Sequence, residues 1–157
     1  MSTFFLHGLD SSGQGTKGRY FSEKFPQVLC PDFSGDLKER LHQFATLSAN
    51  HQNLTLIGSS FGGLMATCFA IAHPERVQQL ILLAPALNFG DYTPPQRLLN
   101  VPTLLVIGKQ DVVTPPNLVL PLARKTFANL KEQLVEDDHM LHHAFYAIPW
   151  QELLFDQ

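Results

Sequence analysis

The chain has 157 residues, of which 45% are hydrophobic and 16% charged, and its formal net charge at pH 7 is −3. This length and composition predict one compact globular domain over residues 1–157. The small negative charge, with no cluster of Lys and Arg, argues against a nucleic-acid or acidic-membrane partner. No stretch reaches the roughly 18 apolar residues of a membrane span.

Short apolar stretches alternate along the chain with longer segments of helical periodicity. The sequence predicts strands at 3–6, 27–30, 54–58, 79–84, 103–108 and 132–136, and helices at about 15–25, 36–49, 60–72, 116–128 and 142–155. Three of the strands are nearly continuous in Val, Ile and Leu, which is typical of strands that helices cover on both faces. Such alternation predicts a three-layer α/β sandwich with about six parallel strands and right-handed crossovers.

Prolines and turn residues set several element boundaries. Pro74 should end the helix that starts near residue 60, because the residue before a proline avoids the α region. Thr114 and Pro115 are expected as the N-cap and the first residue of the fourth helix. Pro149 should kink the last helical segment or start it afresh. The stretch 87–100 reads as a loop with room for one helical turn.

The stretch Gly58-Ser59-Ser60-Phe61-Gly62 follows the third predicted strand and matches G-x-S-x-G. A sharp strand-to-helix turn holds its central residue in a strained conformation, often with positive φ, and needs small neighbours. In this setting the hydroxyl of Ser60 points out of the sheet at the positive end of a helix, as a nucleophile would. The alternative is an ordinary Gly/Ser turn.

A serine needs a base and an orienting acid to act as a nucleophile at neutral pH. Asp111 follows the fifth predicted strand and His139 the sixth, so both should reach the edge of the sheet where Ser60 lies. The competitors are His142 and His143 as bases and Asp137 and Asp138 as acids. We expect the two histidines to be surface or capping residues, and near neighbours of His139 rarely meet its Nδ1 atom. Turn or capping roles are also expected for three further aspartates, Asp32, Asp36 and Asp91.

The tetrahedral intermediate of acyl transfer needs two backbone N–H donors. Phe61, directly after Ser60, should supply one of them. Leu9 should supply the other, because Gly8 lets the chain turn inward after the first strand.

The motifs HGLDSS, GSSFGG, GKQDVVTP and DDHML together resemble those of serine hydrolases with the α/β-hydrolase fold. The chain is most similar to the small YqiA-like esterases without a cap domain, from residue 3 to about 145. The resemblance implies Ser60 as nucleophile, Asp111 as acid and His139 as base, with Leu9 and Phe61 as oxyanion-hole donors. The chain departs from larger members in lacking two leading antiparallel strands and a lid.

The sequence therefore predicts a serine esterase that acts on short acyl esters and needs no cofactor or metal. The alternatives are a thioesterase and a non-catalytic binding module. Few charged groups are at hand to fix an ionic substrate, and apolar walls are expected from Phe33, Leu87, Phe89, Tyr92, Val112 and Met140. Each of these side chains could equally be core or rim.

The N-terminus and the cysteines bear on the compartment. MSTFFLHG has no basic segment before its short apolar run, so it predicts a strand rather than a signal peptide. Cys30 and Cys68 have apolar neighbours and no metal-ligand spacing, as free thiols in a reducing compartment do. We expect a cytoplasmic monomer or weak homodimer with no nucleic-acid or membrane partner.

Overall fold

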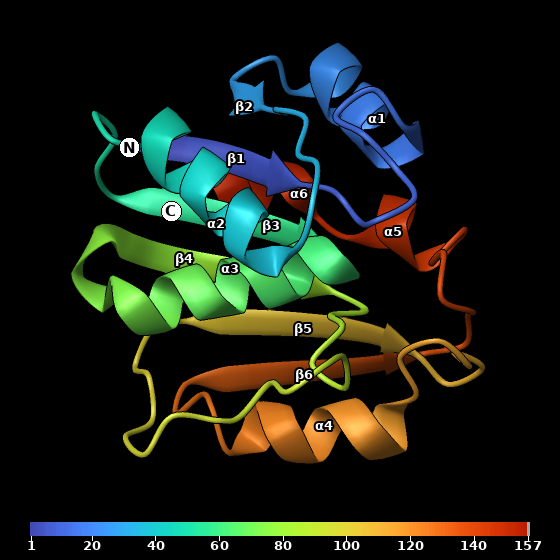
Figure 1. The fold of residues 1–157 in the computed structure, drawn as a ribbon. Coiled ribbons are helices and arrows are strands. Elements are labelled where there is room, and N and C mark those ends of the chain that lie inside the picture. Colours follow the sequence, from blue (N-terminus) through green and yellow to red (C-terminus); the bar gives the residue numbers. More distant parts are fainter. Residues whose placement is uncertain (157) are drawn as a thin grey trace.

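Six parallel strands form one sheet in the computed structural model, which describes residues 1–156 (Figure 1). The strands are β1 (Ser2–Leu6), β2 (Val28–Leu29), β3 (Leu54–Ser59), β4 (Val77–Leu83), β5 (Thr103–Gly108) and β6 (Leu130–Val135). Their order in the sheet is β2-β1-β3-β4-β5-β6. From β1 the chain first adds β2 on one side and then crosses to add β3 and the later strands on the other side. The loops after β1 and β3 therefore border the crevice where open α/β sheets bind ligands.

Helices cover both faces of this sheet. They are α1 (Thr16–Lys24), α2 (Leu37–Leu47), α3 (Phe61–Ala72), α4 (Pro116–Arg124), α5 (Ala144–Ala147) and α6 (Trp150–Leu154), with a 3₁₀ turn η1 (Pro74–Arg76) before β4. One core cluster joins the sheet to α2, α3 and α4, and a second joins it to α1, α5 and α6 (Figure 1). The predicted three-layer sandwich is confirmed.

Aliphatic and aromatic side chains fill both core layers. Aliphatic residues of β3, β4 and β5 pack against α3, whose buried face carries Leu64, Met65 and Phe69. In the opposite layer, aromatic rings of the helices contact one another, and the ring centroids of Phe21 of α1 and Trp150 of α6 lie 4.9 Å apart. Within residues 1–156, no helix is long and apolar enough to cross a membrane.

The boundaries differ from the sequence-based expectation at several points, and the largest shift is at the end of α4, which stops at Arg124 and not near residue 128. Helix α4 begins at Pro116 with Pro115 as its N-cap residue, so the expected N-cap role of Thr114 is wrong. The hydroxyl of Thr114 is instead turned to Asp111. The segment 87–100 contains turns and an isolated bridge between Leu99 and Phe127 but no helical turn. Pro149 does restart the last segment, because α5 ends before it and α6 follows it.

Candidate active site

The turn from β3 to α3 holds Ser60 in a conformation that L-residues rarely adopt, with φ 55° and ψ −116°. The Ser60 N–H donates to the Leu83 carbonyl at the end of β4 (2.9 Å), and the Ser60 carbonyl accepts the Ala86 N–H of the following loop (2.9 Å). Both bonds hold this conformation in place. Glycine is needed beside it, because a Cβ on Gly62 would overlap the Leu6 carbonyl of β1. The local packing therefore sustains the strain and sets the Ser60 hydroxyl at the carboxyl edge of the sheet.

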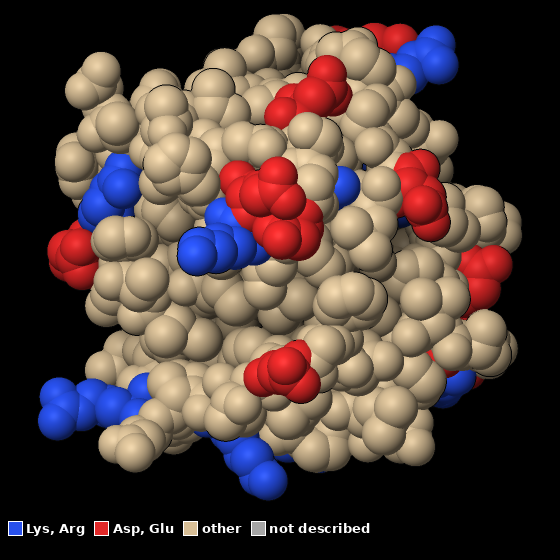
Figure 2. Space-filling view, viewed as in Figure 1, with Lys and Arg blue, Asp and Glu red and all other residues tan. Residues whose placement is uncertain are grey.

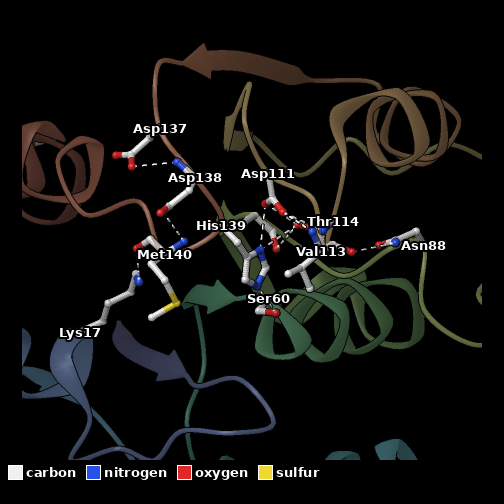
Figure 3. A network of polar contacts seen from close by, with 11 residues as sticks. Lys17, Ser60, Asn88, Asp111, Val113, Thr114, Asp137, Asp138, His139 and Met140 are labelled. Carbon is white, nitrogen blue, oxygen red and sulfur yellow. Dashed lines mark hydrogen bonds and ion pairs between the residues drawn. The ribbon is translucent and has the colours of Figure 1, made fainter.

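Three side chains from three strand ends meet in a row at this edge (Figure 3). The Oγ atom of Ser60 lies 3.0 Å from Nε2 of His139, and Nδ1 of His139 lies 2.8 Å from Oδ2 of Asp111. The Asp111 side chain is fully buried, whereas 18% of the His139 side chain is exposed. Ser60 is half-buried, so the serine and part of the His139 ring can be reached from solvent while the Asp111 carboxylate cannot.

The loop after β5 wraps around the Asp111 carboxylate. Oδ1 accepts the backbone N–H groups of Val113 (2.9 Å) and Thr114 (2.8 Å). Oδ2 accepts the Thr114 hydroxyl at 2.7 Å as well as the His139 ring. Thr114 is buried, and its Oγ1 lies 3.1 Å from His139 Nδ1. Its hydroxyl therefore touches both the acid and the base, a role that no pattern in the sequence signals.

The loop after β6 is shaped by a second carboxylate, that of Asp137. It accepts the N–H groups of Asp138, His143 and Ala144, each at 2.9 Å, and so closes the turn that carries His139. Burial raises the pKa of Asp137. The three N–H donors and the charge of His143 lower it by more, so the pKa lies below its usual value.

Lys17 of α1 fixes the same turn from the other side. Its Nζ donates to the Met140 carbonyl at 2.8 Å, one residue beyond the base (Figure 3). Burial lowers the pKa of Lys17 from its usual value. The base is thus held by contacts from α1 and from its own loop, although neither Lys17 nor Asp137 touches the ring.

The loop after β1 is fixed by a buried histidine. Nε2 of His7 accepts the N–H of Phe33 at 2.8 Å, so the ring proton resides on Nδ1, which donates to the Gly8 carbonyl at 2.6 Å. Burial lowers the pKa of His7, which keeps this neutral form. In the part of the chain that the structure describes, the N–H groups of Leu9 and Phe61 have no hydrogen-bond acceptor. Both are therefore available to an oxygen atom of a ligand.

The expected apolar walls divide into two groups. Phe33 and Leu87 are only 5% and 1% exposed and belong to the core beneath the site. Val112, Met140 and Phe89 are exposed, and Tyr92 is half-buried. Phe89 and Tyr92 line a groove of about 590 Å³ between α2, α3 and the loop after β4, together with Asp36, Leu37, Leu64, Cys68, Ile71, Gly90, Asp91 and Thr93.

The other candidate residues have separate tasks. His142 faces solvent 3.7 Å from Asp138, while the backbone of His143 binds Asp137. Asp36 caps α2 in a capping box with Glu39. Asp32 accepts the N–H of Gly13. Across residues 1–156, no three His, Cys, Asp or Glu side chains gather as ligands of a metal ion would.

About the first two thirds of the chain match a known sequence family. Residues 2–101 match the family described as "Serine aminopeptidase, S33". That stretch includes Ser60 and both expected oxyanion donors, and it ends before Asp111 and His139. The match covers more than half of the chain.

Two curated proteins align with shorter stretches. A probable 1-acylglycerol-3-phosphate O-acyltransferase of Oryza sativa subsp. japonica is 54% identical over 37 residues, which cover 24% of this chain and 9% of that protein. The abhydrolase domain-containing protein abhd-5.2 of Caenorhabditis elegans is 29% identical over 80 residues, covering 51% of this chain and 17% of that protein. The chain thus spans less than a fifth of these relatives.

Solved structures are similar over most of both chains. Alpha/beta hydrolase domain-containing protein 10 from mouse gives a TM-score of 0.73 at 19% identity, covering 88% of this chain and 82% of that one. Est1E from Butyrivibrio proteoclasticus, in a structure with bound ferulic acid, gives 0.74 at 16%, covering 93% and 84%. A monoacylglycerol lipase from Paleococcus ferrophilus gives 0.68 at 14%, covering 87% and 85%. At these identities the likeness is one of fold, the α/β-hydrolase fold.

Proposed function

The chain belongs to the family described as "Serine aminopeptidase, S33" and has the α/β-hydrolase fold, and we propose that it is a serine hydrolase that cleaves short-chain carboxylic esters. The observation that carries the proposal is the row of hydrogen bonds from Asp111 through His139 to Ser60. A Gly/Ser turn without chemistry would need neither the strained Ser60 backbone nor a buried acid behind the ring.

In the proposed reaction, Ser60 Oγ attacks the ester carbonyl carbon while its proton passes to Nε2 of His139. The developing oxyanion accepts the N–H groups of Leu9 and Phe61. The carbonyl then re-forms as the bond to the alcohol oxygen breaks, and His139 returns the proton to that oxygen. A water molecule, deprotonated by the same Nε2, then attacks the acyl-serine carbonyl. The bond to Ser60 Oγ breaks, His139 returns the proton to Oγ, and the carboxylic acid leaves. Asp111 keeps the ring proton on Nδ1 and stabilises the imidazolium.

A preference for short acyl chains is supported by the exposure of the rim. Val112 is 86% exposed, and Phe89 and Met140 about half exposed, so these side chains desolvate only part of a ligand. Each buried methylene contributes about 0.8 kcal/mol, and the gain ends where the wall ends. We expect kcat/KM for p-nitrophenyl esters to peak at about two to six carbons. A peak at ten or more carbons would instead favour an acyl chain seated in the groove of Phe89 and Tyr92.

Labelling with a fluorophosphonate probe tests the central proposal. The wild-type protein should be labelled at Ser60, and Ser60→Ala should abolish labelling and reduce ester turnover by several orders of magnitude. Ser59→Ala is the matched control, because Ser59 ends β3 one residue earlier in the same turn. A folded wild-type protein that resists the probe would favour a non-catalytic binding module, and loss of labelling in Ser59→Ala alone would move the nucleophile.

We also propose a cytoplasmic location, which the state of the two cysteines supports. Cys30 and Cys68 are both free. Burial raises the pKa of Cys30 and raises that of Cys68 to about 11, so both thiols stay protonated and unreactive at neutral pH.

A further inference from the structure

Arg40, in the first turn of α2, is a buried cation without a counter-ion. Only 5% of the residue is exposed. Its Nε donates to the Gly35 carbonyl at 2.8 Å, while Nη1 is buried with no hydrogen-bond partner. No ion pair within residues 1–156 involves its guanidinium. Burying a charge in this way is costly unless a partner compensates it.

The acidic residues nearest to Arg40 in the chain are already used by backbone groups. Asp36 accepts the N–H of Glu39, and Glu39 in return accepts the N–H of Asp36. Asp32 accepts the N–H of Gly13. The protein therefore places carboxylates around α2 without giving one to Arg40.

The position of Arg40 ties it to the proposed oxyanion hole. Its guanidinium carbon lies 5.4 Å from the ring centroid of Phe61, the residue directly after the nucleophile. Burial lowers the pKa of His7, which precedes Gly8 in the loop of the other proposed donor; the charge of Arg40 lowers this pKa further, whereas the charge of Asp32 raises it. Phe61 is the first residue of α3, so two positive features, a guanidinium and a helix N-terminus, adjoin the same site.

We propose that Arg40 binds a carboxylate on the acyl group of the substrate, so that the preferred esters are monoesters of short dicarboxylic acids. This inference rests on the proposed hydrolase function. Phe61 supplies one proposed oxyanion donor and also the ring on which the guanidinium lies, so in this proposal a short acyl chain whose carbonyl sits on the Leu9 and Phe61 amides extends its terminal carboxylate toward Arg40. Charge-assisted, forked hydrogen bonds from arginine suit such a group. The neighbouring groove would not, because Asp36 and Asp91 line it.

The kinetic test compares two p-nitrophenyl esters with five-carbon acyl groups, the neutral pentanoate and the anionic glutarate monoester. The wild-type ratio of kcat/KM, glutarate over pentanoate, should exceed one and fall as salt screens the charge. Arg40→Met keeps the unbranched stem but removes the charge, and should lower this ratio by about 10- to 100-fold. Arg97→Met, at an exposed arginine, is the matched control and should leave the ratio unchanged.

Two further measurements keep the inference separate from the hydrolase proposal. Free glutarate should raise the Tm of the wild-type protein but not that of Arg40→Met, whether or not the protein turns over esters. Arg40→Met should not lower the Tm in the absence of ligand, because an unpaired buried charge contributes little stability. A wild-type ratio at or below one, an unchanged ratio in Arg40→Met, or no glutarate shift would overturn the role of Arg40. Absent probe labelling with an intact glutarate shift would overturn only the hydrolase function.

Discussion

Two buried aspartates at the ends of neighbouring strands organise two loops of the candidate site. Asp111 follows β5 and Asp137 follows β6, and they are 3% and 8% exposed. Each gathers backbone N–H groups of its own loop, two for Asp111 and three for Asp137. The difference lies in the remaining acceptor capacity. Asp111 turns one oxygen to His139 and Thr114, whereas every described bond to Asp137 comes from the backbone.

This contrast separates loop-building from chemistry. A carboxylate that binds only N–H groups of its own loop fixes the path of the chain, and its loss should lower the free energy of unfolding. A carboxylate that also holds an imidazole fixes the tautomer of a proposed base, and its loss should lower kcat. Substitutions at the two positions should therefore affect different measurements.

The largest effect is expected for Asp111→Asn. The asparagine oxygen can still accept the N–H groups of Val113 and Thr114, so the fold should hold. Its NH₂ group would face His139 Nδ1 and force the ring proton onto Nε2, where it blocks proton transfer from Ser60. We expect kcat to fall by about 10⁴-fold with little change in Tm, measured on a short p-nitrophenyl ester. A fall in Tm with kcat intact would make Asp111 a loop residue like Asp137.

Thr114 sharpens the comparison, because its hydroxyl is the donor that Asp137 lacks. Thr114→Val keeps the shape but removes the 2.7 Å bond to Asp111 Oδ2, and we expect kcat to fall by about 10- to 100-fold. Thr114→Ser retains the hydroxyl and should restore most of the rate. If the serine variant were as slow as the valine variant, the methyl packing of Thr114 would matter and not its hydroxyl.

The sequence predicts much of this arrangement, and it fails where side-chain direction decides. Continuous apolar runs define β3, β4 and β5, and carboxyl ends of parallel strands share one edge, so the meeting of Ser60, Asp111 and His139 follows from chain order. Nothing in the spacing shows that Thr114 turns inward. Periodicity cannot tell which loop residues enter the core, and so Phe33 and Leu87 were expected as walls although they lie beneath the site.

For Arg40 the helical period does indicate a buried position, since Phe44 lies one turn later on the same face of α2. What the period cannot supply is the missing counter-ion, because that depends on how every nearby carboxylate is already used. Detecting an unpaired charge requires the full set of hydrogen bonds around it.

Asp137→Asn is expected to affect stability more than rate. The asparagine keeps one oxygen acceptor but presents an NH₂ group to backbone N–H donors, leaving at least one of them unpaired. We expect a loss of about 1–3 kcal/mol in the free energy of unfolding, and Tm to fall by about 2–4 °C per kcal/mol. Urea unfolding with parallel kcat measurements checks this. A large loss of kcat without destabilisation would mean that Asp137 acts on His139 through the turn it closes.

The same substitution gives the smallest effect, a change in how stability depends on pH. The folded-state pKa of Asp137 lies below its ordinary value of 3.8, so the unfolded chain binds this proton more readily than the folded one. Its contribution to stability is therefore present above about pH 4 and is lost as the pH falls through the folded pKa. The difference in unfolding free energy between wild type and Asp137→Asn should be constant from about pH 5 to 8 and shrink below about pH 4. His7, whose pKa is lowered from 6.5, makes both proteins less stable as the pH falls below that value, so its effect cancels in the difference. A difference that persists unchanged at low pH would show that the carboxylate charge has no part in holding the loop.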